Sequence, residues 1–551
     1  MYICKSIKKK GKNMKNRKFD FVPDFANIAF TENGAVSYAT TGKAITDQFG
    51  KAANYRGRDI NAVFKEQEAL WLENKEQALR FPFYLRMVTR KVKVNNDNIT
   101  EKVQKGQGVR DEAFKRLLWL AVNQPDIFYK NIWALPLVGS WKDLWTLMHY
   151  DIELKTNAIN HEVIFDLINQ GLKCAAHMEL IKKFMPRIKT NSKCTTDRAN
   201  ILNTLAREYA NYNGLSYKDY NKLKTSGTAH DFQKLICSGR FKDINWNLIP
   251  GRALSKIASQ KFLTKHELEK TYTDWVLAQP TVKYTGYVYE LAKEVMSGGW
   301  NPRANKLPLF KKITLDKQFD ELVRKAVEDG NILGNVWCAL DTSGSMTSRV
   351  VGDISAFDIC VSLGVFFSTI NTGAFHKNVI MFDNTSRVKQ LKGGFCDMIT
   401  DIISSNTAWG GTNFQSVIDE IVRVREANPK IPLEDFPQTL LIVSDMQFNP
   451  VGGNRNTNYI EMKKKLYKVF PKEFVDSMKF IWWQVTGRTA DVPATLDDSG
   501  CYFFSGFDGS IVSLLLGGEM AEKEAVTKKQ PTMEEMINAA LGQEILSYIT
   551  V

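Results

Sequence analysis

Apolar residues recur in this chain with two different periods, and the change between them falls near residue 334. From about residue 62 to residue 325 they return every three or four positions, the spacing of an amphipathic helix. Strand-like alternation is scarce in this part. Helices are expected over 110–123, 162–174, 175–186, 197–212, 231–237, 264–278 and 285–296. The pattern predicts an all-α domain of packed helix pairs, similar to HEAT-type helical repeats, although no fixed repeat period is visible.

Beyond residue 334 the pattern changes to short apolar runs that alternate with amphipathic segments. The predicted strands are 335–341, 378–382, 439–444, 479–485 and 501–505. The predicted helices are 355–372, 395–405, 415–427, 460–470 and one that starts at Ser510. Regular alternation of strand and helix is typical of an α/β domain with a doubly wound, Rossmann-like parallel sheet. The predicted fold class is therefore multidomain, with a helical domain followed by an α/β domain.

The two ends of the chain differ from both domains. Residues 20–65 show little periodicity and are expected to form an extended lead-in, and eight positive charges lie in the first 18 residues. Near the other end, 533–549 has the pattern of an amphipathic helix that docks onto the rest of the protein. The predicted domains are a flexible basic arm at 1–60, a helical domain at 61–330, an α/β domain at 331–518, and a charged linker with a C-terminal helix at 519–551.

Composition and targeting signals narrow the class of protein. A chain of 551 residues that is 44% hydrophobic and 24% charged is long enough for two or more hydrophobic cores. It has no run of about 18 uncharged apolar residues, and residues 1–10 lack the apolar centre of a signal peptide. We therefore expect a cytoplasmic protein without a membrane partner. Eight scattered cysteines and six unpaired histidines argue against a disulfide framework and a zinc site.

Charge is distributed unevenly between the two halves of the chain. Residues 1–334 hold 55 Lys and Arg against 35 Asp and Glu, whereas residues 335–551 hold 19 against 25. The first half is therefore strongly basic and the second mildly acidic. A basic domain attracts polyanions, and nucleic acids are the abundant polyanions of a cytoplasm. A soluble surface with an excess of lysine is the alternative explanation.

A polar loop follows the first predicted strand of the α/β domain. In the segment D-T-S-G-S, an acid and two hydroxyls stand at alternate positions, Asp341, Ser343 and Ser345. Further along, Thr412 lies just before a predicted helix, and Asp445 lies just after a predicted strand. Because open α/β sheets bind ligands at the carboxyl ends of their strands, these side chains are expected to meet at one edge. Carboxylates and hydroxyls suit Mg²⁺ or another hard divalent cation such as Mn²⁺.

The ordered pattern D-x-S-x-S, then Thr, then Asp resembles the metal-ion-dependent adhesion site (MIDAS) of von Willebrand factor A domains. The resemblance implies a metal site made of Asp341, Ser343, Ser345, Thr412 and Asp445. Two alternatives stay open. The D-T-S-G-S loop could be an ordinary turn whose side chains cap the next helix. The domain could also keep these residues without binding a metal.

Segments in both halves form a second pattern. They are K-G-Q-G-V-R-D-E-A-F at 105–114, L-V-G-S-W-K-D-L at 137–144, W-N-L-I-P-G-R-A at 246–253 and F-S-G-F at 504–507. The pattern resembles a family of uncharacterised proteins related to the TROVE (Ro) class and covers most of residues 80–515. In Ro proteins, a ring of helical repeats is closed by an A domain, and a basic channel binds single-stranded ends of structured or misfolded RNA. The resemblance implies a similar ribonucleoprotein role.

The helical half offers basic residues for contacts with RNA. The candidates are Lys102, Lys105, Arg110, Lys182, Lys183, Arg187, Lys218 and Lys222. The first three, with Lys115 and Arg116, surround a glycine turn at a helix start, where free amides and the helix dipole favour phosphate. The last two alternate with tyrosines that could stack on single-stranded bases, namely Tyr212, Tyr217 and Tyr220.

Each of these clusters has a structural alternative. Arg110 and Asp111 could form an ion pair, the cluster around Lys182 could be a solvated helix face, and the tyrosines could belong to the core. The sequence leaves these alternatives open.

Together these patterns predict a non-enzymatic RNA-binding protein. Hydrolysis would need an activated water and a general base, and no spare His or Glu flanks the metal candidates in the sequence. A G-x-x-x-x-G-K-[ST] loop for ATP is absent. The expected partners are single-stranded or small structured RNA and a protein that supplies an acidic ligand to the metal. The alternative function is a protein-interaction adaptor or a structural component of a larger particle.

Overall fold

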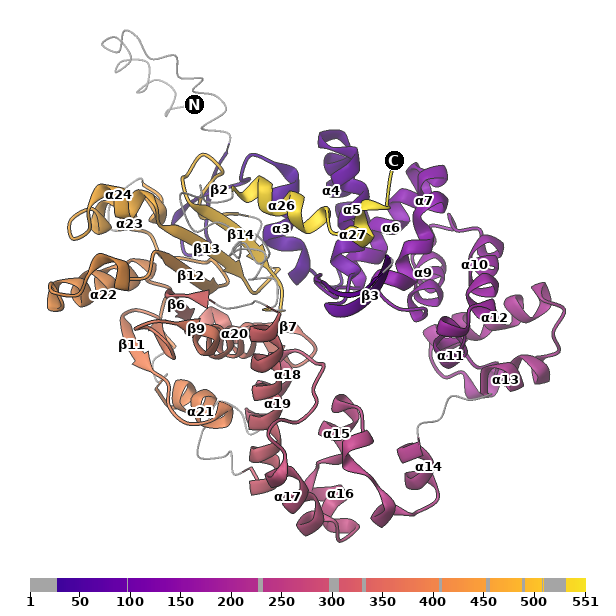
Figure 1. Cartoon of the computed structure of the whole chain (residues 1–551). Coiled ribbons are helices and arrows are strands. Elements are labelled where there is room, and N and C mark those ends of the chain that lie inside the picture. Colours follow the sequence, from indigo (N-terminus) through magenta and orange to yellow (C-terminus); the bar gives the residue numbers. More distant parts are fainter. Residues whose placement is uncertain are drawn as a thin grey trace.

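The computed structural model describes residues 27–96, 98–225, 231–296, 307–329, 333–405, 409–451, 456–487, 491–507, 509 and 532–551. Figure 1 shows an α/β domain mainly in orange on one side and a helical region whose colours run from purple on the opposite side to rose below the sheet. The basic arm at 1–26 and the predicted helix from Ser510 lie outside these residues.

The α/β domain is built on a six-stranded sheet with the order β11-β10-β6-β12-β13-β14. The strands are β6 (Val336–Asp341), β10 (Asn378–Phe382), β11 (Ser386–Gln390), β12 (Thr439–Ser444), β13 (Lys479–Gln484) and β14 (Cys501–Ser505). Neighbouring strands are parallel except for β11, which pairs with β10 in antiparallel fashion at one edge. The predicted α/β class is confirmed, and the antiparallel edge strand is an addition to it.

Helices enclose the centre of this sheet. They are α20 (Ala356–Ile370), α21 (Phe395–Ser405), α22 (Phe414–Ala427), α23 (Asn458–Leu466) and α24 (Lys472–Asp476). Helix α20 packs against β6 and β12, and α22 packs against β10 and β11. All six residues of β6 and of β12 are buried, so both faces of these central strands are covered. Continuous apolar runs such as V-W-C-A-L are the expected sequence of such doubly covered parallel strands.

The helical region consists mainly of consecutive helices that pack as pairs. Its helices are α4 (Ile60–Glu73), α5 (Lys75–Arg86), α6 (Asp111–Asn123), α7 (Pro125–Asn131), α8 (Leu135–Val138), α9 (Lys142–Glu153), α10 (His161–Lys173), α11 (Ala175–Phe184), α12 (Asp197–Tyr212), α13 (Tyr217–Thr225), α14 (Asp231–Cys237), α15 (Gly251–Ile257), α16 (Gln260–Lys265), α17 (Glu269–Ala278), α18 (Val288–Val295) and α19 (Leu309–Glu328). Neighbours along the chain, such as α4 and α5 or α10 and α11, contact each other. The predicted helical domain is confirmed.

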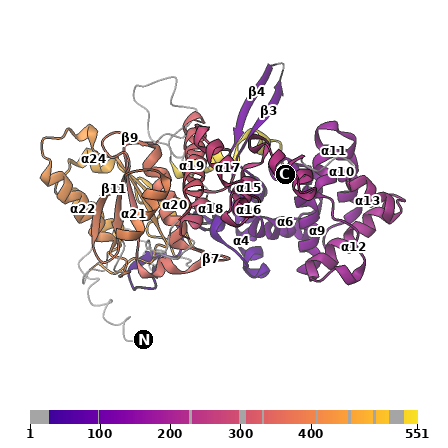
Figure 2. The same cartoon turned by 90° about the horizontal axis from the view of Figure 1, so that it is seen from below.

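The helices follow a curved path that starts and ends at the α/β domain (Figure 1). At the start, α3 (Ala44–Lys51) packs against β14. At the end, α18 packs against α20, and α19 packs against α20 and α21. Helices α10 to α13 lie at the end of the molecule opposite the sheet in both views (Figures 1 and 2). The helical region is therefore anchored to the α/β domain at both of its ends.

One two-stranded hairpin interrupts the helices, and the sequence reading missed it. Strand β3 (Arg90–Asn96) pairs with β4 (Asn98–Gln104) in antiparallel fashion. Figure 2 shows the hairpin projecting away from the helices around it. Its sequence alternates valine with lysine and turns at asparagines, which is a strand and turn signal. The many charged residues, which are depleted in strands, obscured that signal.

The segment that precedes the helical region is not an extended lead-in where the structure describes it. Besides α3, it forms the short pair β1 (Ile28–Phe30) and β2 (Val36–Tyr38). The side-chain amide of Asn54 donates to the Gln484 carbonyl at 2.5 Å, and the Gly506 amide donates to Asn54 Oδ1 at 2.9 Å. The expectation of an extended segment over 20–65 was therefore wrong for this part, because its few apolar side chains pack on the edge of the sheet.

The C-terminal segment docks as predicted, but as two helices. These are α26 (Met533–Leu541) and α27 (Glu544–Ser547), separated at Gly542. Helix α26 packs against α3, α5 and β14, and α27 packs against α5. In the part of the chain that the structure describes, no helix combines the length and apolar character needed to cross a membrane.

Candidate metal centre and basic surfaces

The predicted metal residues lie on three loops at one edge of the sheet. Asp341 ends β6, and Asp445 follows directly after the end of β12. These two strands are parallel neighbours, so their carboxyl ends meet at the same edge. Thr412 lies just before α22. The parallel topology thus brings residues about a hundred positions apart into one place, as the motif order predicted.

Hydrogen bonds fix the carboxylate of Asp341 within the D-T-S-G-S loop. The Asp341 side chain is fully buried. Its Oδ1 accepts a hydrogen bond from the Ser343 amide at 2.9 Å, and its Oδ2 accepts one from Ser444 Oγ at 2.5 Å. The hydroxyls of Ser343 and Ser345 lie 3.1 Å apart. An acid and two hydroxyls of this loop therefore form one compact set of oxygen atoms.

Backbone hydrogen bonds join the other two loops to this set. The Gly344 amide donates to the Gly410 carbonyl at 3.0 Å, which ties the D-T-S-G-S loop to the segment that holds Thr412. The Asn449 amide donates to the Thr412 carbonyl at 2.8 Å, which ties that segment to the loop after β12. A side chain at position 344 would place its Cβ 3.0 Å from the Trp409 carbonyl. Glycine at this position therefore permits the close approach of the two loops.

Two residues beside the centre have left-handed backbone conformations that are unusual for residues with side chains. Trp409 has a φ of 45°, and Met446 has a φ of 63°. Such conformations cost about 1 to 3 kcal/mol each and persist only where surrounding contacts hold them. The Met446 amide donates to Ser444 Oγ at 2.9 Å, and the ring of Trp409 lies 4.8 Å from that of Phe357. Strained backbone of this kind concentrates at binding sites.

Electrostatics at the centre favour a bound cation. Burial, followed by repulsion from Asp445, raises the pKa of Asp341 well above the usual range of a carboxyl group. Among the residues that the structure describes, Asp341 takes part in no ion pair. A divalent cation would stabilise both ionised carboxylates, and their oxygens, with those of the hydroxyls, are the ligands that Mg²⁺ prefers. The donor set therefore fits the predicted cation.

The same donor set does not fit zinc. No group of three or more His, Cys, Asp or Glu that could hold a metal is found in the described part of the chain. Two carboxylates and three hydroxyls leave coordination positions for water or an outside ligand, as is usual for Mg²⁺.

The basic candidates on α11 and α13 come together in space. Helix α11 carries Lys182 and Lys183 in its last turn, and α13 carries Lys218 and Lys222. The two helices contact each other, and Lys224 Nζ donates to the Lys183 carbonyl at 3.2 Å. Arg187, Lys183, Lys218 and Lys222 are exposed, and Lys182 is half-buried. We call these five residues, Lys182, Lys183, Arg187, Lys218 and Lys222, the α11/α13 surface.

The tyrosines beside this surface divide between core and exterior. Tyr220 is fully buried and belongs to the core, so it cannot stack on a base. Tyr212 and Tyr217 are 41% and 44% exposed. They end α12 and begin α13, and the guanidinium of Arg207 lies 5.6 Å from the centre of the Tyr217 ring. Tyr217 therefore lies next to Lys218 of the α11/α13 surface, whereas Tyr212 donates to Asp166 of α10 at 2.8 Å.

The candidates near the glycine turn are not one surface. Lys115 and Arg116 are buried, and Arg116 bridges the carboxylates of Glu112 and Glu66 at 2.8 and 3.0 Å. Both cations are structural, so their assignment to a phosphate-binding turn was wrong. Lys105 is half-buried next to the C-terminal segment, where its amide donates to Gln543 Oε1 at 2.8 Å. Lys102 lies on β4, and its side chain is outside the described residues.

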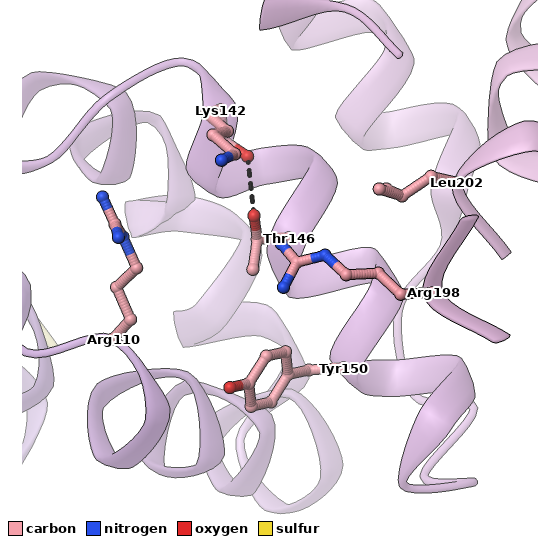
Figure 3. A pocket seen from close by; sticks show the side chains of 6 residues that line it. All are labelled: Arg110, Lys142, Thr146, Tyr150, Arg198 and Leu202. Carbon is pink, nitrogen blue, oxygen red and sulfur yellow. Dashed lines mark hydrogen bonds between the residues drawn. The ribbon is translucent and has the colours of Figure 1, made fainter. Parts of the chain in front are cut away.

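Arg110 faces a cavity that the sequence reading did not anticipate. Asp111 pairs with Lys115 at 3.0 Å, whereas Arg110 lies 3.8 Å from Asp143 with its side chain 59% exposed. The cavity has a volume of about 300 Å³ and is lined by Arg110, Lys142, Thr146, Tyr150, Arg198 and Leu202 (Figure 3). Lys142 and Arg198 lie in the first turns of α9 and α12. The sequence signal that could have pointed to Lys142 and Arg198 is that both cations lie at the start of a helix.

The fold and the loops define a two-part protein, a helical region joined to an α/β domain with a polar centre at the carboxyl edge of its sheet. Residues 336–545 match a family described as "Domain of unknown function (DUF7788)". This match begins at the first residue of β6 and extends into α27. It therefore covers the α/β domain and the docked C-terminal segment.

Two further similarities cover both parts of the chain. "Uncharacterized protein L728" of Acanthamoeba polyphaga mimivirus is 24% identical over an alignment of 528 residues, and the alignment covers 90% of this chain and 85% of that protein. The crystal structure of the Deinococcus radiodurans RO (RSR) protein is 13% identical, with a TM-score of 0.35, over 79% of this chain and 88% of that chain. The first similarity indicates that the two parts occur together in another protein.

Proposed function

We propose that this protein is a non-enzymatic RNA-binding protein, in which the helical region binds single-stranded or small structured RNA and the α/β domain binds Mg²⁺ or a similar cation. The observation that supports it most directly is the α11/α13 surface with the exposed Tyr217 beside it. Cations that follow a backbone, next to aromatic rings that stack on bases, are what sequence-tolerant binding of single strands requires.

The distribution of charge supports the same proposal. Residues 1–334 carry 20 more positive than negative charges, and the other 217 residues carry six more negative than positive charges. Long-range attraction would therefore direct RNA toward the helical region and away from the acidic domain. The resemblance of the sequence to the TROVE class points to the same ligand.

The α/β domain is proposed to act as a metal-dependent binding module of the von Willebrand factor A type. Asp341 and Asp445 would bind the cation together with the hydroxyls of Ser343, Ser345 and Thr412. The cation would hold the three loops in one arrangement, because it offsets the repulsion between the two buried carboxylates. A metal site of this kind binds a ligand without hydrolysing it, so it needs no general base beside the cation.

Binding of a fluorescently labelled, unstructured oligoribonucleotide tests the RNA proposal. The protein is purified free of nucleic acid, and fluorescence anisotropy is measured for wild type and for a variant with Lys182, Lys183 and Arg187 all changed to glutamine. A control variant changes the exposed lysines Lys464, Lys468 and Lys472 of the α/β domain to glutamine, with the same loss of charge. We expect weaker binding in the first variant alone. Equal weakening in both variants would show that only net charge matters.

A protein-interaction adaptor is the second candidate function, and the metal centre favours it. Two carboxylates are few for a divalent cation, so an acidic side chain of a partner could complete the coordination. Capture of an acidic protein partner that is lost with EDTA and in Asp341→Asn, but is unaffected by the α11/α13 variant, would support this function. RNA binding that persists in EDTA would favour the first proposal.

A further inference from the structure

The cavity beside α6, α9 and α12 gathers three cationic side chains from three separate helices. Arg110 directly precedes the first residue of α6, Lys142 is the first residue of α9, and Arg198 is the second residue of α12. Figure 3 shows Arg110 and Arg198 approaching the cavity from opposite sides, with Lys142 and Thr146 between them. The residues come from positions up to 88 apart in the sequence, so only the packing of the helices brings them together.

These positive charges are poorly neutralised by the protein. Among the described residues, Lys142 and Arg198 take part in no ion pair with an acidic side chain. Arg110 lies 3.8 Å from Asp143, but the other oxygen of that carboxylate already pairs with the buried Arg86 at 2.6 Å. The cavity therefore keeps a positive charge that an anion could neutralise.

The other acidic groups near the cavity are also engaged. Asp111 pairs with Lys115 and accepts a hydrogen bond from Tyr150 Oη at 3.2 Å. Glu153 lies 3.5 Å from His149 Nδ1. Burial lowers the pKa of Lys142 most, and repulsion from Arg110 and Arg198 lowers it further. A bound anion would relieve this repulsion.

The cavity lies along the sides of two helices, because its lining includes Thr146 and Tyr150 of α9 and Leu202 of α12. A ligand there would therefore be bound mainly by side chains. The Thr146 hydroxyl donates to the Lys142 carbonyl at 3.1 Å, and Tyr150 donates to Asp111, so both hydroxyl hydrogens are already used. The cationic side chains are left as the main donors for a ligand.

We propose that this cavity binds a phosphate monoester, namely the terminal phosphate of an RNA bound on the helical region. The inference rests on the proposed RNA-binding function and names the part of the RNA that this cavity recognises. A terminal monoester carries about 1.5 to 2 negative charges at pH 7 and three free oxygens, whereas an internal phosphodiester carries one charge and is substituted on both sides. Three cations around one cavity match the more highly charged group. A nucleoside monophosphate has the same chemistry and is the other source of such a group.

A set of oligoribonucleotides of one sequence tests the proposal. One carries a 5′-phosphate, one a 3′-phosphate and one hydroxyls at both ends. Their affinities are measured by competition against a labelled RNA for wild type, Lys142→Gln, Arg198→Gln and the control Lys173→Gln. Lys173 is an exposed lysine at the end of α10 that does not line the cavity. Arg198→Lys keeps the charge, and circular dichroism checks the fold of each variant.

We expect wild type to bind one of the phosphorylated RNAs about tenfold more tightly than the RNA with two hydroxyl ends, as charged hydrogen bonds of this kind provide. Lys142→Gln and Arg198→Gln should remove this preference and leave the affinity for the hydroxyl RNA within about twofold. Lys173→Gln should keep the preference, and Arg198→Lys should keep most of it. Wild type that binds all three RNAs equally would overturn the proposal, while the RNA-binding function would stand.

Adenosine monophosphate distinguishes failure of the cavity from failure of the proposed function. Binding is measured by isothermal titration calorimetry with wild type and Arg198→Gln. If no RNA binds but adenosine monophosphate binds to wild type and not to Arg198→Gln, the monoester site stands with a small-molecule ligand, and the RNA function fails. If neither an RNA end nor adenosine monophosphate is recognised by wild type, the monoester site is refuted.

Discussion

The candidate metal centre of the α/β domain and the basic cavity of the helical region are built in opposite ways. In the metal centre, two buried acids and three hydroxyls lie on loops at one sheet edge. In the cavity, three cations lie at the starts of three helices. The first collects negative charge in an acidic domain, and the second collects positive charge in a basic region.

The comparison shows how differently the two architectures encode a site in sequence. Parallel strands fix where their carboxyl ends lie, so the order Asp341, Thr412, Asp445 already implied one location. The position of Arg198 relative to Arg110 depends instead on how α12 packs against α9. That packing is set by buried side chains such as Trp145 and Tyr209, whose rings lie 5.7 Å apart. No local sequence motif predicts how α12 packs against α9.

The largest expected effect is on the free energy of unfolding, and it distinguishes structural cations from ligand-binding cations in the helical region. Arg116→Met should lower the free energy of unfolding by about 3 kcal/mol, because it removes the nearer of the two cations that pair with the buried carboxylate of Glu112 and leaves only Arg58 at 3.4 Å. Arg198→Gln, at an exposed position, should change it by less than about 0.5 kcal/mol. Urea denaturation measures both. Similar losses in the two variants would mean that Arg198 is part of the folded network rather than a ligand-binding residue.

At the metal centre, Asp341→Asn should weaken binding of Mg²⁺ or Mn²⁺ by on the order of 100-fold, because affinity depends on the number of charged ligands. The Asn oxygen can still accept the hydrogen bond from the Ser343 amide, and its NH2 group can donate to Ser444 Oγ, so the fold should persist. Calorimetric titration with Mn²⁺ measures the effect. Asp419→Asn, at an exposed residue of α22 that pairs with Lys465, is the matched control. Equal metal binding in wild type and Asp341→Asn would refute the site.

The α11/α13 surface should account for much of the salt dependence of RNA binding. Changing Lys182, Lys183 and Arg187 to glutamine should weaken binding to a single strand by about 10- to 50-fold and reduce the slope of log affinity against log salt by about 2. Anisotropy titrations from low to high KCl give both values. An unchanged slope would place the RNA elsewhere on the helical region.

A smaller effect tests Thr412, which contributes a hydroxyl rather than a charge. Thr412→Ala should weaken metal binding by about 3- to 10-fold, and Thr412→Ser should restore most of it, because serine keeps the oxygen ligand. The same Mn²⁺ titration applies. If serine and alanine behave alike, the hydroxyl does not contact the metal.

The smallest expected effect is a pH dependence at the cavity. Affinity for a terminal phosphate should rise from pH 5 to pH 7, because the monoester gains its second charge near pH 6. It should then fall by about two- to threefold in the alkaline range, because the lowered pKa of Lys142 makes this side chain neutral earlier than an ordinary lysine. Lys142→Arg should remove the alkaline fall, since arginine stays charged. A fall that persists in this variant would have another cause.

Much of the α/β domain could be predicted from the sequence, down to identical bounds for Phe395–Ser405, Thr439–Ser444 and Cys501–Ser505. Buried parallel strands leave long apolar runs, and a doubly wound sheet alternates them with helices. The five metal candidates could also be proposed from spacing, because they end a strand or lie in loops that follow a strand or precede a helix. Local pattern and global topology agree in this domain.

The parts of the structure that could not be predicted from the sequence depend on contacts between distant segments. Lys115 and Arg116 looked like surface cations beside a glycine turn, but α4 and α5 cover them, and Glu66 and Glu112 neutralise Arg116. The helix Ala44–Lys51 was missed because its burial is provided by β14, which is more than 450 residues away in the sequence. Helical periodicity predicts which face is buried, but not the element that buries it.

The central claim is that RNA binds the helical region and the cation binds the α/β domain, independently of each other. We would measure anisotropy of a labelled single-stranded RNA across a salt series, with Mg²⁺ and with EDTA. The account predicts tight binding at low salt, a steep loss with increasing salt, and the same curve in EDTA. Binding that disappears in EDTA, or no binding even at low salt, would contradict it and favour the metal-dependent adaptor.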